Sequence, residues 1–354
     1  MRPSPRPSTA IIGAGIAGLA CARALHGAGL PVTLFEKSRG PGGRLASRRL
    51  AEATLDLGAQ FFSVRHEAFR REVMSWLTAG VAAPWPWKLW RIENKHWRYR
   101  HDGGERYCGQ PRMSAITRHL ADGLALHSEC RILGLSRRAH AWWLETESGE
   151  THGPFDRVAI SCPSPQAMAL LAAHDDTLAA ECQAVEQRAC WAAWACLDTP
   201  FPRVPGVEAD WQAAQGQEGP LRFVSRNHLK PGRWAQGESL TLLALPEWSE
   251  QNLECKPSQV ACMLFDALQQ MLPAGVRLPR PTQLGAHRWR FAHPELPATS
   301  PKPTDQDYRL SPLGLGLCGD GWRGARVEDA WLSGHHLGLA LARASTGEAL
   351  TICP

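Results

Sequence analysis

The sequence predicts an α/β fold in which a Rossmann-type nucleotide-binding domain is interrupted by an inserted α+β domain built on an antiparallel sheet. The chain opens on a strand, a glycine loop, a helix and a second strand, the order of a nucleotide-binding β-α-β unit. It closes on an apolar strand, a Gly-Asp turn and an amphipathic helix. Short alternating segments rich in Trp, Pro and charge lie between, and these are typical of antiparallel hairpins. We therefore expect both chain ends to share one domain.

Hydrophobic periodicity and turn residues place the elements along the chain. Helices are expected at 16–28, 66–79, 113–124 and 327–343, and strands at 9–12, 32–35, 54–57, 155–161, 240–245 and 313–318. Residues 81–111 predict antiparallel hairpins, and 126–135 with 141–146 predict another. The cofactor domain should comprise 1–79, 112–165 and 313–354, and the substrate domain 80–111 and 166–312.

The first glycine loop, Gly13 to Gly18, has the context that a dinucleotide-binding motif requires, with a strand before it and a helix after it. Gly13 permits a tight turn, Gly15 lets backbone N–H groups approach a pyrophosphate, and Gly18 lets the helix pack closely. Glu36, at the end of the next strand, should accept hydrogen bonds from ribose hydroxyls. The loop predicts a dinucleotide cofactor but does not distinguish NAD from FAD.

Two further stretches favour FAD. The second glycine loop, Arg39 to Arg44, follows the second strand directly, so it reaches the same pyrophosphate and supplies a bidentate guanidinium. Gly319-Asp320 follows the last strand, where a carboxylate can hold ribityl hydroxyls. The helix from Val327 can then direct its N-terminus, which carries roughly half a positive charge, at the isoalloxazine.

Composition excludes several other classes of function. The net charge of +5 is spread along the 354 residues without a long basic run, which argues against nucleic-acid binding. The start of the chain lacks the apolar core of a signal peptide, and apolar stretches fall short of the ~18 residues that span a bilayer, so we expect a cytoplasmic protein.

Eleven irregularly spaced cysteines without a Cys-x-x-Cys pair predict buried thiols rather than disulfides or a metal site. Fifteen tryptophans predict core packing or a cavity walled with indoles.

Matches to a known family extend over nearly the whole chain. They are Ile11 to Leu19, Gly42-Gly43-Arg44 with Arg48, Leu57 to Phe62, Met113 to Thr117, His152 to Phe155, Trp248-Ser249, Gln251 to Leu253, Ala286 to Trp289 and Gly319 to Gly334. On these residues the chain resembles flavin amine oxidase–type enzymes, specifically their bacterial renalase-like branch.

The resemblance implies non-covalent FAD in a two-domain fold like that of p-hydroxybenzoate hydroxylase. It also implies oxidation of isomeric (2- or 6-) dihydro-NAD(P) to NAD(P)⁺ by hydride transfer to flavin N5, with O2 reduced to H2O2, as a metabolite repair reaction. The expected reaction partners are a small dinucleotide and O2. Such a transfer depends on geometry and exclusion of water, so we assign no catalytic acid or base.

Site residues follow from the resemblance position by position. The cofactor contacts fall on Gly13, Ala14, Gly15, Ile16, Ala17, Gly18, Glu36, Lys37, Gly43, Arg44, Gln60, Ile132, Gly319, Asp320 and Val327. The substrate contacts fall on Phe61, Phe62, Ser63, Val64, Arg65, Trp191 and Arg323.

The residues themselves leave alternatives open at the substrate positions. Phe61 and Phe62 suit either an apolar wall for a nicotinamide ring or an ordinary core. Arg65 and Arg323 suit either substrate phosphates or a solvated surface, and strand alternation does not decide whether Trp191 or Trp194 faces a cavity.

One departure from the family concerns the substrate pocket. Some members carry a His where this chain has Leu243-Ala244, and His287 and His293 are either a replacement or structural residues.

Two other functions compete with the first. An amine oxidase would use an aromatic cage at the flavin; the three tyrosines lie far from the flavin motifs in sequence, whereas Trp322 is adjacent to them. A non-enzymatic flavoprotein is the third hypothesis.

Overall fold

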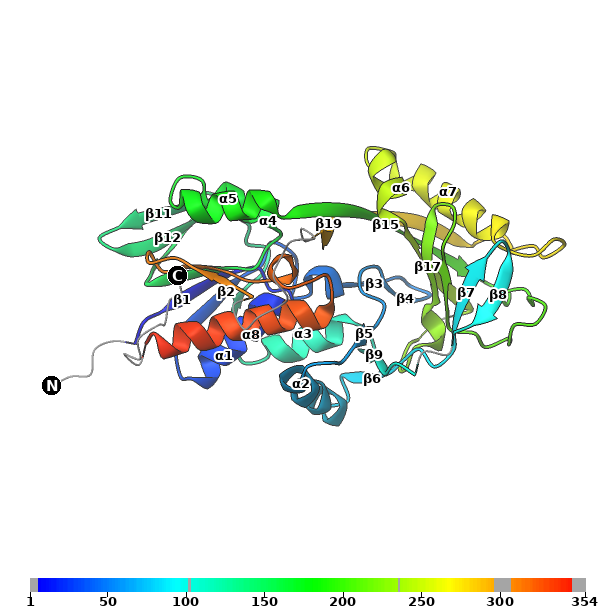
Figure 1. Cartoon of the computed structure of the whole chain (residues 1–354), viewed down its shortest axis with the longest axis horizontal. Helices are drawn as coiled ribbons and strands as arrows, with labels where there is room; N and C mark the ends of the chain where they lie inside the picture. Colours follow the sequence, from blue (N-terminus) through cyan, green and yellow to red (C-terminus); the bar gives the residue numbers. More distant parts are fainter. Residues whose placement is uncertain (1–5, 101–102, 235, 296–306, 346–354) are drawn as a thin grey trace. The chain divides into compact units, whose positions relative to one another are not determined.

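The computed structural model describes residues 6–100, 103–234, 236–295 and 307–345, which form two compact units (Figure 1). The first unit comprises residues 1–43, 117–187 and 294–354, and the second comprises 44–116 and 188–293. Both units are discontinuous in sequence. The first contains the described segments 6–43 and 307–345, and residues 44–79, expected in the cofactor domain, belong to the second.

The first unit is built on a six-stranded sheet. Its strands, in spatial order, are β10 (Ala125–His127), β2 (Val32–Phe35), β1 (Thr9–Ile12), β14 (Arg157–Ile160), β21 (Leu315–Leu317) and β20 (Arg309–Leu310). All neighbours are parallel except β20 and β21. Ile12 is in register with Phe35 on one side and Ile160 on the other, so the residues that follow these strands meet at one edge. Ligands of open α/β sheets bind at such an edge.

Helices and a small sheet complete the first unit. α1 (Ile16–Gly27) packs along α8 (Val327–Arg343), which joins the first and last helices of the chain (Figure 1). Gly334 and Gly338 of α8 permit this close approach, because a Cβ on Gly334 would lie 2.0 Å from the Ala17 carbonyl oxygen. The remaining elements are α3 (Ser114–Ala121), whose first turn belongs to the second unit, α4 (Ser164–Leu171), α5 (Asp176–Ala184), η3 (Asp320–Trp322) and the antiparallel strands β11 (Ile132–Arg138), β12 (Ala141–Thr146) and β13 (Thr151–Phe155).

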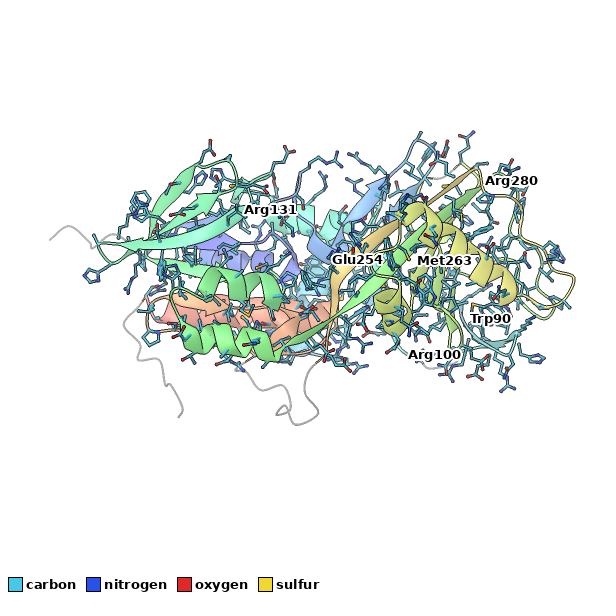
Figure 2. The ribbon with its side chains drawn as sticks, turned by 90° about the horizontal axis from the view of Figure 1, so that it is seen from above. Trp90, Arg100, Arg131, Glu254, Met263 and Arg280 are labelled. Carbon is cyan, nitrogen blue, oxygen red and sulfur yellow. The ribbon has the colours of Figure 1, made fainter. Side chains whose placement is uncertain are left out.

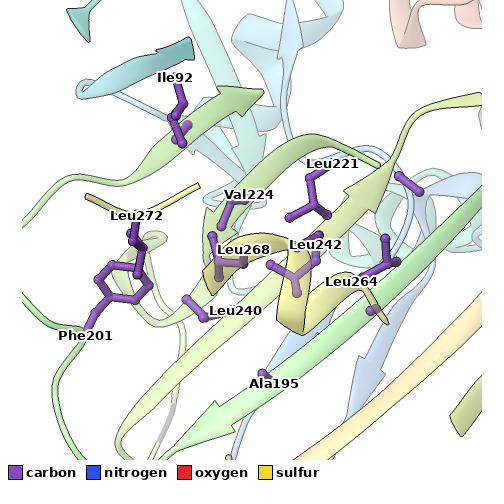
Figure 3. Packing of buried hydrophobic residues seen from close by; sticks show 14 of the residues in the cluster. Ile92, Ala195, Phe201, Leu221, Val224, Leu240, Leu242, Leu264, Leu268 and Leu272 are labelled. Carbon is purple, nitrogen blue, oxygen red and sulfur yellow. The ribbon is translucent and has the colours of Figure 1, made fainter. Parts of the chain in front are cut away.

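The second unit is built on a seven-stranded sheet. Its strands, in spatial order, are β19 (Gln283–Glu295), β15 (Glu186–Leu197), β18 (Glu238–Ala244), β17 (Leu221–Arg226), β16 (Ala213–Gly216), β7 (Leu89–Glu93) and β8 (His96–Tyr99). On one face, α6 (Pro246–Gln251) and α7 (Pro257–Gln270) cover an apolar core. Figure 3 shows Leu264 and Leu268 of this core beside Leu242 of β18.

The opposite face of this sheet contacts the hairpin β3 (Ser47–Arg49) and β4 (Thr54–Asp56). The other small elements of the second unit are the three-stranded sheet β5 (Phe62–Ser63), β9 (Arg106–Gly109) and β6 (Ala82–Pro84), the helix α2 (Glu67–Thr78), the short helix η2 (Asn227–Leu229), and η1 (Gly43–Leu45), whose first residue belongs to the first unit. Leu55 and Leu57 pack on that opposite face against Trp194 of β15. The expected fold class, a Rossmann-type α/β domain with an inserted α+β domain on an antiparallel sheet, is confirmed, except that β16 and β7 of that sheet pair in parallel.

One expected hairpin differs in the structure. Residues 125–127 form β10 beside β2 in the parallel sheet, and the hairpin consists of β11 and β12 alone. The backbone N–H of Glu36 donates to the His127 carbonyl, so this segment extends the edge where Glu36 lies.

No helix in the described ranges is long and apolar enough to cross a lipid bilayer.

The cysteines lead to a labelling prediction. The described cysteines are all free thiols; Cys21 and Cys190 are buried, whereas Cys262 on α7 is exposed, and Cys353 lies outside the described residues. Burial raises the pKa of the Cys21 thiol to about 12 and that of Cys190 to about 11, so little reactive thiolate exists at neutral pH. We expect a maleimide at pH 7.5 to modify Cys262 quickly and Cys21 and Cys190 only after unfolding, as read by peptide mass spectrometry. Rapid labelling of Cys21 in the folded protein would contradict this.

Candidate cofactor and substrate site

The first glycine loop in the first unit requires glycine at two positions, Gly13 and Gly18. Gly13 has a φ of +102°, and a Cβ on Gly18 would lie 2.1 Å from the Gly13 carbonyl oxygen. α1 starts after Gly15 with no side-chain cap and no acidic residue in its first turn. Its N–H donors and positive end are therefore left for an anion. This fits the pyrophosphate of a dinucleotide.

Glu36 ties the glycine loop to the end of β2. Its carboxylate is buried and accepts the backbone N–H of Ala14 at 2.9 Å and that of Ser38 at 2.8 Å. Each carboxylate oxygen retains lone-pair capacity for a ribose hydroxyl. Lys37, next in sequence, is exposed. Ile132 shares an apolar cluster with Phe35, so the structure brings this expected adenine neighbour to the same strand end.

The second glycine loop packs on the first. The Gly42 N–H donates to the Ala14 carbonyl at 3.0 Å. Gly43 has a φ of +51°, and a Cβ there would lie 3.2 Å from the Gly15 Cα. The structure therefore brings Gly42 and Gly43 of the second loop against the first glycine loop within the first unit. Arg44 belongs to the second unit, where its guanidinium donates to the Ala292 carbonyl at 3.1 Å.

The closing motif lies at the same edge of the six-stranded sheet, because β21 is parallel to β14 and β14 to β1. Gly319 has a φ of +135° and open space around the position of a Cβ, and Asp320 is buried in η3. Two buried carboxylates, Glu328 and Asp329, occupy the first turn of α8 after Val327. Asp329 pairs with Arg323 and Arg326, and Glu328 pairs with Arg326. The expected role of this helix start toward the isoalloxazine stays a prediction.

Phe61 lies in an aromatic cluster of the second unit. Its half-buried ring is 5.7 Å from that of Phe223 and 6.5 Å from that of Trp85, with the Arg106 guanidinium at 5.9 Å from its centre. We call Phe61, Phe223 and Trp85 the aromatic wall.

The other residues of this stretch are placed differently from Phe61. Phe62 is buried against Phe69 and Trp76, and Val64 is buried as well. Ser63 pairs in β5 with Arg106, and Arg65 is exposed.

The two candidate tryptophans of β15 lie on opposite faces of the seven-stranded sheet. Trp191 is fully buried in the core beneath the helices, and its indole N–H donates to the Asn252 carbonyl at 3.0 Å. Trp194 shares the other face with Leu243, the register partner of Phe223, and the Arg48 guanidinium lies 4.4 Å from its ring. The structure therefore does not bring Trp191 together with Phe61.

Gln60 belongs to a buried polar network in the second unit. Its amide oxygen accepts from Lys230 Nζ at 3.1 Å and Ser225 Oγ at 2.7 Å, and its amide nitrogen donates to the carbonyls of Asp56 and Gly58. All four hydrogen-bonding positions of the amide are thereby filled. Gln60 holds the segment that leads into Phe61.

Sequence reasoning missed the charged members of this network. Asp56, Lys230 and Arg233 have fully buried side chains, and both cations pair with the Asp56 carboxylate. Burial lowers the pKa of Lys230. Burial also opposes ionisation of Asp56, but Lys230 and Arg233 outweigh it and hold the pKa of that carboxyl below its ordinary value. The available signal was Asp56 itself, a charged residue that ends β4 between Leu55 and Leu57.

Arg323 is engaged within the first unit, where its guanidinium pairs with Asp307 Oδ2 at 2.7 Å.

The two candidate histidines, His287 and His293, both lie on β19 in the second unit. The His287 ring lies 4.4 Å from Trp289, and its pKa is lowered mainly by burial and also by the nearby Arg48 charge. His293 accepts a hydrogen bond from Arg222 at 3.2 Å if its Nε2 is unprotonated.

On the opposite side of β19, two arginines share one carboxylate. Glu254, labelled in Figure 2, pairs with Arg288 at 2.9 Å and with Arg290 at 2.8 Å.

Comparison with known protein families agrees with this geometry. The model described as flavin containing amine oxidoreductase matches residues 66–336, and the NAD(P)-binding Rossmann-like domain model matches residues 11–74. A curated relative, the tRNA 5-methylaminomethyl-2-thiouridine biosynthesis bifunctional protein MnmC of Magnetococcus marinus, is 63% identical over 41 residues. That segment covers 12% of this chain and only 6% of the relative.

Solved structures show likeness over the whole fold. A putative protoporphyrinogen oxidase from Exiguobacterium sp. 255-15 is 14% identical with a TM-score of 0.71, covering 96% of this chain and 99% of that one. A double mutant of putrescine oxidase, made in a redesign of cofactor binding, is 13% identical with a TM-score of 0.70, covering 95% and 98%. At this identity the likeness establishes the fold alone.

Proposed function

Because the chain belongs to the family of flavin-containing amine oxidoreductases, we propose that it oxidises isomeric 2- or 6-dihydro-NAD(P) to NAD(P)⁺ and passes the electrons to O2. The reaction balances as dihydro-NAD(P) + O2 + H⁺ giving NAD(P)⁺ + H2O2. A C–H bond of the dihydropyridine breaks with its electron pair, and an aromatic pyridinium forms. The gain in aromaticity supplies the driving force, so no side chain has to move a proton on the pyridine ring.

The cofactor is non-covalent FAD, and the first unit offers residues that fit it. The uncapped start of α1 and the paired glycine loops suit the pyrophosphate, and Glu36 suits a ribose. Asp320 is the candidate for the ribityl chain. When bound, FAD supplies an acceptor for a hydride and a donor of electrons to O2.

The observation that carries the choice of substrate is the charge around the aromatic wall. An amine substrate is a cation, and an aromatic cage binds it through free ring faces. Here the Phe61 ring already has Arg106 at 5.9 Å, and the Trp85 ring has Lys230 at 4.6 Å. Lys230 is buried and paired with Asp56, so the Arg106 charge at the half-buried Phe61 ring is the one that disfavours an ammonium and attracts phosphates. This supports an anionic ligand with a planar ring.

Rapid mixing of the FAD-loaded protein with purified dihydro isomers tests the proposal. We expect flavin absorbance near 450 nm to bleach roughly 100-fold faster with a 2- or 6-dihydro isomer than with ordinary NADH. Ordinary NADH carries its hydride on a different ring carbon, and a site shaped for the isomers would hold that carbon away from flavin N5. The Arg106→Gln variant should raise KM for the isomers with FAD content unchanged, and Arg98→Gln on the exposed strand β8 is the matched control. Equal rates with ordinary NADH and the isomers would overturn the proposal.

Amine oxidation is the second candidate, and the family match favours it. Trp322 follows Asp320, but the Arg309 guanidinium lies 5.1 Å from its ring, which places a cation at this aromatic residue as well. Release of peroxide with mono- or polyamines, and none with the dihydro isomers, would establish amine oxidation as the function instead.

A further inference from the structure

Ser333, in the second turn of α8, joins two segments of the first unit. Its hydroxyl is fully buried, accepts the backbone N–H of Gly319 at 2.9 Å and donates to the backbone carbonyl of Asp307 at 2.6 Å. Gly319 is the residue immediately before Asp320, with a φ of +135° that other residues rarely adopt. One hydroxyl therefore fixes the peptide from which the Gly-Asp turn begins.

Asp307, which accepts the Ser333 hydroxyl, is itself held in place by its side chain. The Asp307 side chain is fully buried and pairs with His336 Nδ1 at 2.8 Å and with Arg323 at 2.7 Å. His336 lies on α8, less than one turn beyond Ser333. The carbonyl that accepts the hydrogen bond from Ser333 therefore belongs to a residue whose side chain pairs with α8, so it does not move independently of that helix.

Gly334, the next residue on α8, fixes where Ser333 lies relative to the first glycine loop. A Cβ on Gly334 would lie 2.0 Å from the Ala17 carbonyl oxygen, and a Cβ on Gly338 would lie 2.7 Å from that of Cys21. The two helices therefore approach to backbone contact along this face. Ser333 and Gly334 together connect the Gly-Asp turn with the helix that begins in the first glycine loop.

We propose that Ser333 is a positioning residue for FAD: it holds the Gly319 peptide so that Asp320 and the first glycine loop bind the cofactor together. The inference rests on the proposed function, in which Asp320 would contact the cofactor and Ser333 would act through Asp320. Without the hydroxyl, the buried Gly319 N–H has no partner, and the turn must shift to satisfy it. The open space at Gly319 is where that shift would occur.

The Ser333→Ala variant tests this without adding bulk to the core. We expect Kd for FAD to rise about tenfold, measured on apoprotein by quenching of FAD fluorescence, with an altered visible circular dichroism spectrum of the bound flavin. Ser239→Ala is the matched control, because the Ser239 hydroxyl is also buried but has no hydrogen-bond partner among the described residues. Its Kd should not change.

A double-mutant cycle with Asp320→Ala separates positioning from general packing. If Ser333 acts through Asp320, adding Ser333→Ala to Asp320→Ala causes little further loss of FAD affinity. Fold-changes in Kd that multiply would overturn the proposal, as would a Ser333→Ala protein that unfolds more easily as apoprotein but binds FAD with unchanged Kd. Both readouts are independent of substrate, so they stand whether or not dihydro-NAD(P) is oxidised.

Discussion

Replacing Gly18 by alanine is expected to deprive the protein of its FAD. The added Cβ would lie 2.1 Å from the Gly13 carbonyl oxygen and 2.6 Å from Ser161 Oγ. Neither the carbonyl nor the start of α1 can yield without moving the loop that presents N–H groups to the pyrophosphate. We expect Kd for FAD to rise on the order of 100-fold or more, a loss of about 3 kcal/mol, measured by fluorescence titration of apoprotein.

The same helix offers a matched control. A Cβ on Gly27, at the other end of α1, meets nothing within 4 Å. Alanine there should leave Kd for FAD unchanged and raise helix stability by about 1 kcal/mol at most. If Gly18→Ala and Gly27→Ala bind FAD equally well, the first glycine loop is not the pyrophosphate site.

The elements at the chain ends were predictable because their signals are local. The expected helix 327–343 is α8 to the residue, and the expected helix 16–28 exceeds α1 by one residue. α1 follows Gly15 directly, α8 starts three residues after Gly324, and the adjoining strands β1 and β21 are short apolar runs followed by a glycine turn. The glycine loops lie at these junctions, which is why these particular helices and strands could be anticipated from the sequence.

Strand partners were harder to predict because pairing depends on distant sequence. β10 is three residues long, and only its pairing with β2 distinguishes it from the first strand of a hairpin. Likewise, the alternation of β15 placed Trp191 and Trp194 on opposite faces but contained no sign of which face α7 covers.

The charged network of the second unit was the largest omission. Asp56 and Lys230 are 174 positions apart in sequence, and each alone resembles a surface residue. Their pairing becomes visible only when η2 is folded beside β4. The sequence-based assignment of Gln60 to the cofactor has not been tested, but its amide bonds in the structure all lead to this network instead.

Replacing Lys230 by methionine is expected to destabilise the protein strongly. The ammonium donates to Asp56 at 3.0 Å and to the backbone and side-chain oxygens of Gln60 at 3.2 and 3.1 Å, all without exposure to water. Removing one partner of such a buried pair costs about 3–5 kcal/mol, because the remaining groups stay desolvated and unpaired. Urea unfolding at pH 7 measures the loss. Lys88→Met is the control, since Lys88 pairs with Asp210 at the surface and should change stability little.

Low pH should also remove the stability that the buried Asp56–Lys230 pair gives the unsubstituted protein. The pKa of Asp56 is lower in the folded state than in the unfolded chain, so its ionisation stabilises the fold above the unfolded value near 4. That contribution declines as the pH falls below this value and disappears once the folded-state pKa is passed. In Lys230→Met the folded pKa rises toward the unfolded one, so the free energy of unfolding should depend less steeply on pH in this acid range. A parallel pH dependence in the two proteins would show that Lys230 does not hold Asp56 ionised.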